Sequence, residues 1–541
     1  MSKLAMCLAM MCTPALSAPP HYRVIVPDGV ELPIGVLESG TVVYASEAGG
    51  FSAWTPSGTE TWIEAGHALQ GLGIGTKANL IDLACTSEGT LFLSASTWND
   101  SGFYARTPDG HEAWWLRRGE SLGEAGRFQF TLWPALAVTG PKSCVVTVIT
   151  DSGIQTPDGY FKGGAALLSL VADDGGGDPH IEIIAQAGDR TPDGTDVFLH
   201  YNSDHDSAFQ YLCGNARGQV TLITRVFKAE TNFFEPRWTL WRWSKESGLQ
   251  RLLDPEQLVG DKSYEPDFMC LSPAGTICVV ARDADWKSSV LVFDGPNGTT
   301  PRIAAWVGEE LPEGRILTIE EAKVNDRGSI LFSGFVVPRE GGREQLMLFH
   351  RTASGVTQTV ASPLWCHDAR LCGMVPAYGR ASLTNDELIV FNVEADDTGR
   401  QGGFYAFDGR AGGDAFPRAI VAPRMTVWPS ATWPWMISAS PPGTIAANSA
   451  GRVALFTVGV GSMAVFDPRI EDCVSDLNGD SLVDTTDFEL FLGQYDVLNC
   501  TDSEMPSGCS ADANGDEHVD DADFMIFALA YSNGACPGLE E

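Results

Sequence analysis

One short pattern recurs along most of the chain: a glycine followed by alternating apolar and other residues, as in Gly40-Thr-Val-Val-Tyr-Ala. The apolar runs are short and rich in β-branched residues, which favours strands over helices. Successive copies start about 49 to 75 residues apart. Six copies begin with glycine and two are variants, and they start at Gly40, Gly89, Ser143, Gly218, Gly275, Gly328, Glu387 and Gly451.

Each copy is followed by a second predicted strand, which often ends on an aromatic residue. Pro-Gly and Asp-Gly turns such as Thr107-Pro108-Asp109-Gly110 follow, and these residues favour tight reversals. A third strand then runs into a Gly-rich loop, as in the stretch from Trp115 to Leu122. The second strands are predicted at Phe51–Trp54, Phe103–Ala105, Ala166–Leu170, Trp238–Trp243, Val290–Phe293, Leu346–Phe349, Phe404–Phe407 and Met463–Phe466.

The repeat predicts a mainly β protein with a β-propeller over residues 21–470. Eight small sheets suit a propeller of eight blades, with seven as the alternative, and the strand Tyr22–Val26 can complete the last blade. The alternative folds are an open β-solenoid or two separate β-domains. The turn Asn325-Asp326-Arg327-Gly328 before a strand also resembles the tandem repeats of large secreted bacterial proteins of unknown activity.

Two calcium-binding loops, 36 residues apart, occupy the acidic C-terminal region. Oxygen-bearing side chains stand at positions 1, 3, 5, 9 and 12 of each loop, and position 7 needs only a backbone carbonyl. This spacing suits Ca²⁺, a hard cation that takes six to eight oxygens. The predicted ligands are Asp476, Asn478, Asp480, Leu482, Asp484 and Asp487 in the first loop, and Asp512, Asn514, Asp516, His518, Asp520 and Asp523 in the second.

Each loop runs into an apolar helix, and the duplicated loop–helix unit over residues 473–536 resembles a type I dockerin module with EF-hand-type loops. That resemblance implies a small α-helical domain with two Ca²⁺ sites and a cohesin-like or cell-surface protein as partner. Thr485 and Thr486 match the hydroxyl pair that contacts the partner in dockerins, whereas Asp521 and Ala522 do not. Position 6, normally glycine, is Ser481 in the first loop and Glu517 in the second. The alternative is a structural calcium site without a partner.

Cysteines and charge follow the same repeat. Cys473 and Cys509 are 36 residues apart, as are Cys500 and Cys536, and we favour the disulfides Cys473–Cys500 and Cys509–Cys536 among three possible pairings. From Cys473 onward there are 16 acidic residues and no Lys or Arg, nearly half of the formal net charge of −35. Such a chain is a poor nucleic-acid ligand, and its folding should be coupled to Ca²⁺ binding.

Residues 1–18 read as a signal peptide. Lys3 precedes an apolar stretch to Leu16, and the small residues Ser17 and Ala18 offer a cleavage site. A buried N-terminal helix is the alternative. No other stretch is long enough for a membrane helix. We therefore expect a secreted or cell-surface protein, whose mature chain keeps 11 of the 13 cysteines and so has at least one thiol without an intramolecular partner.

Candidate chemistry in the body is sparse. The cluster from His200 to Asp206 is the densest polar group, and Asp204 and Asp206 are the best candidates for a hydrolase pair. The run Cys366-His367-Asp368 can be catalytic, or Cys366 can pair with Cys372. Tryptophans at 428, 433 and 435 are candidates for carbohydrate binding, whereas Trp241 and Trp243 should share one packed sheet face.

These features favour a secreted, non-catalytic binding or scaffold protein: a propeller that binds a ligand, and a Ca²⁺-binding tail for docking or surface attachment. Carbohydrate is a possible ligand. The alternative is a carbohydrate-active enzyme, a polysaccharide hydrolase or lyase, on the propeller, and a purely structural surface protein is the third interpretation. No P-loop, dinucleotide fingerprint or serine nucleophile elbow is present in the sequence.

Overall fold

The computed structural model describes most of residues 23–466 and parts of the tail between 475 and 531. Outside the described residues lie 1–22, 64–78, 156–160, 173–178, 200–208, 229–235, 364–374, 395–402, 411–417, 422–425, 428–434, 437–444, 467–474, 478–484, 498–510, 512–517, 532–541 and several shorter segments. Among the described residues no helix is long and apolar enough to cross a membrane.

The described strands form eight antiparallel sheets of four or five strands and one two-stranded ladder. The first four sheets consist of β2 (Val30–Val36), β3 (Val42–Ser46), β4 (Phe51–Thr55), β5 (Gly58–Ile63); β6 (Asn79–Cys85), β7 (Leu91–Ser96), β8 (Ser101–Arg106), β9 (Glu112–Arg117); β10 (Phe128–Gly140), β11 (Ser143–Gln155), β12 (Phe161–Val171), β13 (His180–Gln186); and β14 (Asp196–Phe198), β15 (Phe209–Gly214), β16 (Gln219–Lys228), β17 (Arg237–Ser244), β18 (Gly248–Leu253).

The other four sheets follow in the same order along the chain. They consist of β19 (Leu258–Val259), β20 (Lys262–Leu271), β21 (Ile277–Asp283), β22 (Ser288–Phe293), β23 (Arg302–Trp306); β24 (Gly314–Ile316), β25 (Glu321–Val324), β26 (Ile330–Pro338), β27 (Gln345–Arg351), β28 (Thr357–Ala361); β29 (Val375–Leu383), β30 (Leu388–Glu394), β31 (Gly403–Asp408), β32 (Arg418–Val421); and β35 (Ile445–Ala447), β36 (Val453–Thr457), β37 (Ser462–Phe466), β1 (Arg23–Val26). The ladder pairs β33 (Thr426–Val427) with β34 (Trp435–Met436), and η1 (Gly123–Ala125) is a short 3₁₀ turn.

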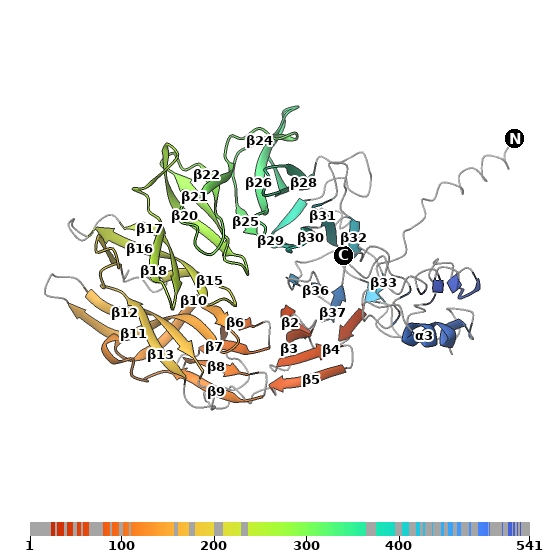
Figure 1. Ribbon diagram of the computed structural model, residues 1–541, viewed down its shortest axis with the longest axis horizontal. Helices are drawn as coiled ribbons and strands as arrows, with labels where there is room; N and C mark the ends of the chain where they lie inside the picture. The colour runs from red at the N-terminus through yellow and green to blue at the C-terminus, as the bar shows by residue number, and fades with distance from the viewer. Residues whose placement is uncertain are drawn as a thin grey trace.

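The sheets stand around a common centre, as Figure 1 shows. Their innermost strands contact one another in chain order, from β2 to β6, β10, β15, β20, β25, β29 and β35, and β35 returns to β2. The ring is also closed by hydrogen bonds, because β1 pairs with β37 in the register Arg23↔Val465 and Val24↔Ala464. The protein is therefore a mainly β protein with a β-propeller body, and the predicted role of the first strand is confirmed.

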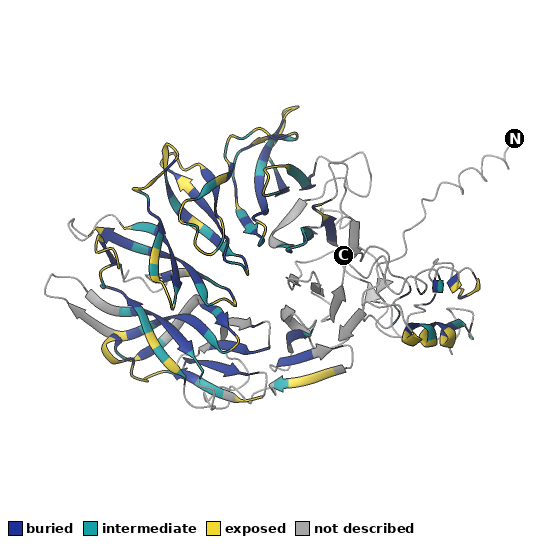
Figure 2. Ribbon diagram, viewed as in Figure 1, coloured by how far each residue is buried: buried dark blue, intermediate teal, exposed yellow. Residues whose placement is uncertain are grey.

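The core lies between neighbouring sheets rather than inside any one of them, and Figure 2 shows the buried residues along the strands. Strand β21 illustrates the reason. Cys278 and Val280 pack with the sheet that follows, whereas Ile277, Val279 and Ala281 pack with the sheet that precedes. Alternate side chains point to opposite faces of a strand, so each blade must bury both faces against its neighbours.

All eight predicted Gly-x-apolar strands are found, and each pairs with the innermost strand of its sheet: β3, β7, β11, β16, β21, β26, β30 and β36. Four of them follow tight turns whose glycines, Gly89, Gly218, Gly275 and Gly328, lie in the left-handed region. In one of these turns the Gly328 N–H donates to the Asn325 carbonyl at 3.1 Å, with φ of +80° at Gly328. A side chain at such a position strains the backbone, which explains why the repeat begins with glycine.

Candidate functional site

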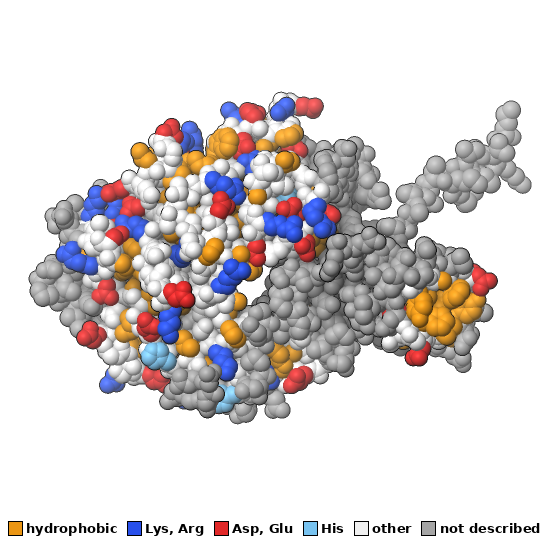
Figure 3. All heavy atoms as spheres, viewed as in Figure 1, with side chains coloured by type: hydrophobic (Ala, Val, Ile, Leu, Met, Phe, Trp, Pro, Cys, Tyr) orange, Lys and Arg blue, Asp and Glu red, His pale blue; other side chains and the backbone are white. Residues whose placement is uncertain are grey.

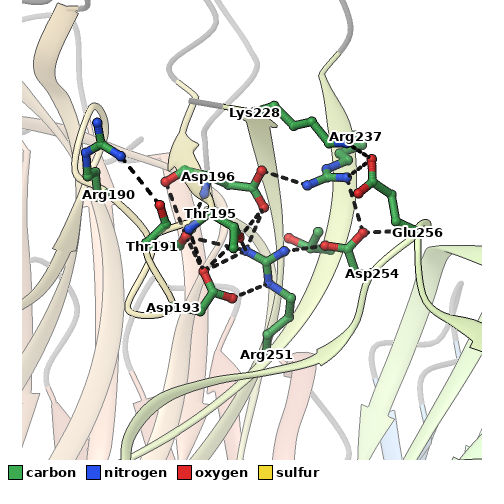
Figure 4. A network of polar contacts seen from close by, with 12 residues as sticks. Arg190, Thr191, Asp193, Thr195, Asp196, Lys228, Arg237, Arg251, Asp254 and Glu256 are labelled. Carbon is green, nitrogen blue, oxygen red and sulfur yellow. Dashed lines mark hydrogen bonds and ion pairs between the residues drawn. The ribbon is translucent and has the colours of Figure 1, made fainter. Parts of the chain in front are cut away.

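A network of charged side chains lies at one end of the sheet formed by β14–β18 (Figure 4). Asp196 opens β14 and pairs in register with Lys228 at the end of β16, and Arg237 opens β17. Arg251 lies in β18, and Asp254 follows that strand directly. Antiparallel pairing brings these strand ends together, although the residues are up to 58 positions apart (254 − 196).

Four of these residues form a closed, alternating ring of ion pairs. The two oxygens of the fully buried Asp196 form ion pairs with Arg237 and with Arg251, each at 2.6 Å. Asp254 forms ion pairs with the same two residues, at 3.3 Å from Arg237 and more closely from Arg251. Both guanidinium groups are mostly buried, and the Arg251 guanidinium also stacks 4.7 Å from the centre of the Trp241 ring. Each buried charge thus faces two opposite charges.

The loop before β14 extends the network. Arg251 also pairs with Asp193 at 3.0 Å, and the Asp193 carboxylate accepts hydrogen bonds from the hydroxyls of Thr191 and Thr195 at 2.6 and 3.0 Å. At the other side, Glu256 pairs with Arg237 at 2.8 Å and also with Lys228.

The backbone of this loop is a recurring unit. The Gly188 N–H donates to the Phe198 carbonyl at 2.8 Å, and Gly308 donates to Ile316 at 2.8 Å in the corresponding loop before β24. The loop before β10 has the same bond, from Gly119 to Phe128 at 2.8 Å. The Gly-rich loops that follow the third strands are therefore fixed hairpins that connect one blade to the next.

Hydrogen bonds and opposite charges lower the pKa of two carboxylates of the network, Asp193 and Glu256. Burial raises the pKa of Asp193, but the hydrogen bonds from Thr191 and Thr195 and the charge of Arg251 outweigh it, so the pKa lies below the ordinary value. The hydrogen bond from Lys228 lowers the pKa of Glu256. For Arg237, burial lowers the pKa, and the charges of Asp254 and Asp196 more than compensate. These groups do not exchange protons near neutrality, so the network is a structural clamp rather than an acid–base site.

Because the clamp depends on ionised carboxylates, we expect the propeller body to lose stability in acid. A carboxylate whose folded pKa is depressed stabilises the fold above its unfolded pKa, about 4 for Asp and Glu, and the contribution is lost as the pH falls through the folded pKa. We expect the urea midpoint of the body to fall as the pH drops below about 4. In Asp193→Asn the acid-induced decrease should be smaller than in the wild type. Equal pH profiles for the two proteins would contradict this assignment.

A second local feature is the turn between β21 and β22, which carries Trp286. The Trp286 N–H donates to the Asp283 carbonyl at 2.9 Å, and the Asp283 carboxylate accepts from the backbone N–H of Lys287 at 2.9 Å. Trp286 has φ of +63°. In turns with the same hydrogen-bond pattern, the equivalent positions are occupied by Gly275 and Gly355. Trp286 is nevertheless 75% exposed. A bulky residue in this conformation costs free energy and gains no burial in return.

The surroundings of Trp286 combine polar and apolar groups. The Arg282 guanidinium lies 6.0 Å from the indole centre and pairs with Asp267 at 2.5 Å. Trp306, 45% exposed, ends β23 opposite Ser289, near the start of β22. Both indoles thus lie at the same end of the sheet. We call Trp286, Arg282 and Trp306 the tryptophan rim.

Several predicted candidates fall outside the described residues. They are the His200–Asp206 cluster with Asp204 and Asp206, the group Cys366, His367, Asp368 and Cys372, the indoles of Trp428 and Trp433, and the side chain of Trp435. The prediction for Trp241 and Trp243 is confirmed, because both are buried in one cluster between neighbouring sheets. Trp115 is buried too.

Only part of the tail is described, and this part contains the helix α3 (Thr485–Tyr495). The predicted second helix is represented by helical residues at 521, 523, 524, 527, 528 and 531. Phe491 and Phe527, 36 positions apart, stack with ring centres 4.9 Å apart. The pairs Phe488–Phe527 and Phe491–Phe524 are both 5.9 Å apart, as a two-fold arrangement of equal units requires. The two copies of the sequence repeat therefore pack against each other through equivalent aromatic residues.

Of the predicted calcium ligands, four are described. Asp487 and Asp523, at position 12 of the two loops, are fully buried, whereas His518 and Asp520 are exposed. No group of three or more His, Cys, Asp or Glu side chains that could hold a metal occurs within the described part. The loop residues Asp476, Asn478, Asp480, Leu482, Asp484, Asp512, Asn514 and Asp516, and the cysteines Cys473, Cys500, Cys509 and Cys536, lie outside it.

The tail also exposes apolar side chains, which gather on one face in Figure 3. Among the described large apolar residues, Leu490, Leu492, Phe524 and Tyr531 are 38–42% exposed. All four belong to the helical residues that follow the predicted loops. Exposed apolar groups gathered in a small acidic domain are typical of an interaction surface.

Sequence reasoning missed the clamp and the tryptophan rim. The Gly188–Gly194 loop was visible in the sequence, but Arg251, which pairs with Asp193 of this loop, is 57 residues beyond Gly194 (251 − 194). For Trp286, the available signal was a bulky residue in a turn where other repeats have glycine.

A search of family models finds no match to this chain, and a search of curated proteins finds none either. Solved structures with a similar fold include the Dos1 propeller, at 11% identity and a TM-score of 0.40, covering 83% of this chain and 94% of that one. Sqt1 from Saccharomyces cerevisiae has 12% identity and a TM-score of 0.40, covering 82% and 97%. Prolyl oligopeptidase B from Galerina marginata has 10% identity and a TM-score of 0.42, covering 79% and 54%. The propeller assignment accordingly rests on the sheet topology of this chain itself.

Proposed function

We propose that this protein is an exported, non-catalytic binding protein. Its propeller body holds a ligand at the tryptophan rim, and its tail binds two Ca²⁺ ions and docks to another protein or to the cell surface. The observation that carries the proposal is the exposed Trp286 indole on a left-handed backbone, a placement that a purely structural turn does not need.

Carbohydrate is the ligand class that the rim suits best. An exposed indole offers a flat apolar face on which a sugar ring can stack, and the adjacent Arg282 and Asp267 offer donors and acceptors for hydroxyl groups. The charges of this pair cancel each other, which favours a neutral polyhydroxylated ligand over a strongly charged one.

Substitution of Trp286 tests the rim. In Trp286→Gly we expect the free energy of unfolding to change by less than about 1 kcal/mol, because relief of the left-handed strain offsets the greater freedom of glycine. The affinity for a panel of soluble polysaccharides, measured by affinity electrophoresis, should fall at least about tenfold. A decrease of this size is expected when an aromatic contact is lost.

The matched control is Val356→Ala. Val356 is 58% exposed in the turn between β27 and β28, which has the same hydrogen-bond pattern. Binding should be unchanged in this variant. Equal retention of Trp286→Gly and the wild type on every polysaccharide that the wild type binds, or no binding by the wild type, would contradict the proposed ligand class. Release of soluble sugar from the polysaccharides would indicate the alternative, a carbohydrate-active enzyme.

For the tail, the support comes from the two buried carboxylates at equivalent loop positions. Asp487 and Asp523 have identical places in the two copies, and position 12 of such a loop supplies a carboxylate ligand to Ca²⁺. The exposed Leu490, Leu492, Phe524 and Tyr531 then form the docking surface for a cohesin-like domain or a cell-surface protein.

Export follows from residues 1–18 as a signal peptide, and its test is the N-terminal sequence of the mature protein. We also propose that the eight sheets are eight blades. The contacts between successive innermost strands and the pairing of β1 with β37 support this number.

A further inference from the structure

Two cysteines lie directly opposite each other on neighbouring strands. Cys270 of β20 and Cys278 of β21 are partners in the antiparallel register, joined by the tight turn from Ser272 to Thr276. Partners in such a ladder have Cα atoms about 4.5–5.5 Å apart, which lies inside the range of about 4.4–6.8 Å that a disulfide spans. Both are free thiols in this structure, and they hydrogen-bond to each other.

A third thiol lies beside this pair. The Cys213 thiol, on β15 of the preceding blade, donates to the carbonyl of Met269 at 3.7 Å, one residue before Cys270. Cys278 is fully buried, and Cys270 is half-buried. The fourth described free cysteine is the buried Cys144 of β11, which packs in a different cluster.

We propose that Cys270 and Cys278 form a cross-strand disulfide when the protein matures in an oxidising compartment. The oxidant is a low-molecular-weight disulfide such as oxidised glutathione. The Cys270 thiolate attacks one sulfur of that disulfide and releases the first thiol. The Cys278 sulfur then attacks the Cys270 sulfur of the mixed disulfide and releases the second thiol. Two protein thiols are thereby oxidised and one small disulfide is reduced to two thiols, with no net change in protons.

The surroundings of the two thiols determine which one attacks first and which one resolves the mixed disulfide. The hydrogen bond from Cys278 lowers the pKa of the Cys270 thiol, whereas the pKa of Cys278 is raised. Cys270 is also the more accessible of the two. It is therefore the first nucleophile, and Cys278 is the resolving thiol held in register behind it. The finished bond would be buried between two blades and protected from exchange.

The test uses the full chain and has two arms. In the first arm, folded reduced protein is incubated with a mixture of reduced and oxidised glutathione. In the second arm, the urea-unfolded chain refolds in the same mixture. Free thiols are alkylated under denaturing conditions, and the protein is cleaved with chymotrypsin, which cuts after Leu271. Mass spectrometry should find the peptides of Cys270 and Cys278 linked and lighter by two hydrogen atoms, with Cys144 and Cys213 alkylated.

The variants separate the possible pairings. Cys213→Ser should keep the link, and Cys278→Ser should lose it. The oxidised wild type should melt at a higher temperature than the reduced form, and this difference should vanish in Cys278→Ser. Four alkylated thiols in both arms, or a Cys213–Cys270 link in place of the predicted one, would overturn the proposal. Because the oxidant is added in vitro, this outcome is independent of whether the protein is exported.

Discussion

Arg251→Met is expected to lower the free energy of unfolding of the propeller body by about 3–5 kcal/mol, the range found when one partner of a buried ion pair is removed. Methionine keeps an apolar stem but removes the charge. Asp196, which is fully buried, would then retain only Arg237, and Asp193 and Asp254 would lose their closest cation. Stacking of the guanidinium on Trp241 would be lost as well. Urea denaturation followed by tryptophan fluorescence measures the change.

The chain offers a closely matched control in Arg282→Met. Arg282 also pairs with an aspartate and also lies over a tryptophan ring, but both partners of its ion pair are nearly half exposed, at 44% and 46%. Exposed pairs contribute at most about 1 kcal/mol, so this variant should remain close to the wild type. A similar small change in both variants would show that the ring around Asp196 does not stabilise the body.

Removal of Ca²⁺ is expected to unfold the tail and leave the body intact. Calorimetric titration of the full chain, after chelator is removed by dialysis, should reveal two Ca²⁺ sites with dissociation constants of about 10⁻⁷ to 10⁻³ M, the range of loop sites of this type. The tail contains 16 acidic residues and no Lys or Arg, so the chain repels itself unless a cation is bound. At a free Ca²⁺ concentration of about one hundred times the dissociation constant, each site should add about 2.7 kcal/mol to the stability of the tail.

The double variant Asp476→Ala/Asp512→Ala should bind no Ca²⁺, because it removes the first ligand of each loop. Glu489→Ala is the control, since Glu489 is an exposed acidic residue of α3 that is not a predicted ligand. The Phe491–Phe527 packing reports on folding through amide hydrogen exchange. Equal protection of the tail in Ca²⁺ and in chelator would refute the calcium assignment, and it would do so without affecting the predictions for the tryptophan rim or for the cysteine pair.

Local sequence patterns located the strands that follow a tight turn. The strand after Gly275, for example, is indicated by a glycine at φ of +96° and by the apolar run from Ile277 to Val280. Both signals are local, because the turn needs a residue that tolerates the left-handed region and the strand is buried on both faces. The same pattern identified, in every sheet, the strand that pairs with the innermost strand.

The innermost strands carried no comparable signal. Strand β29 contains Pro376 and Gly379, and its register shifts between Pro376 and Ala381. In the blade of the clamp the edge strand is divided in two, because β14 and β15 pair with different parts of β16. These strands are held by contacts with their neighbours around the ring, so their own residues need not have a regular alternation.

By itself, the sequence determined the repeat, the turn residues, the chain end that closes the ring and the duplicated acidic loops, because each of these depends on residues close together or at a fixed spacing. Tertiary structure alone decided which distant residues meet. Asp196 faces Arg237 and Arg251, Cys270 faces Cys278, and Trp286 stays exposed while Trp241 is buried. The physical reason is that strand register and the stacking of one sheet on the next fix these contacts, and both arise only when the blades assemble.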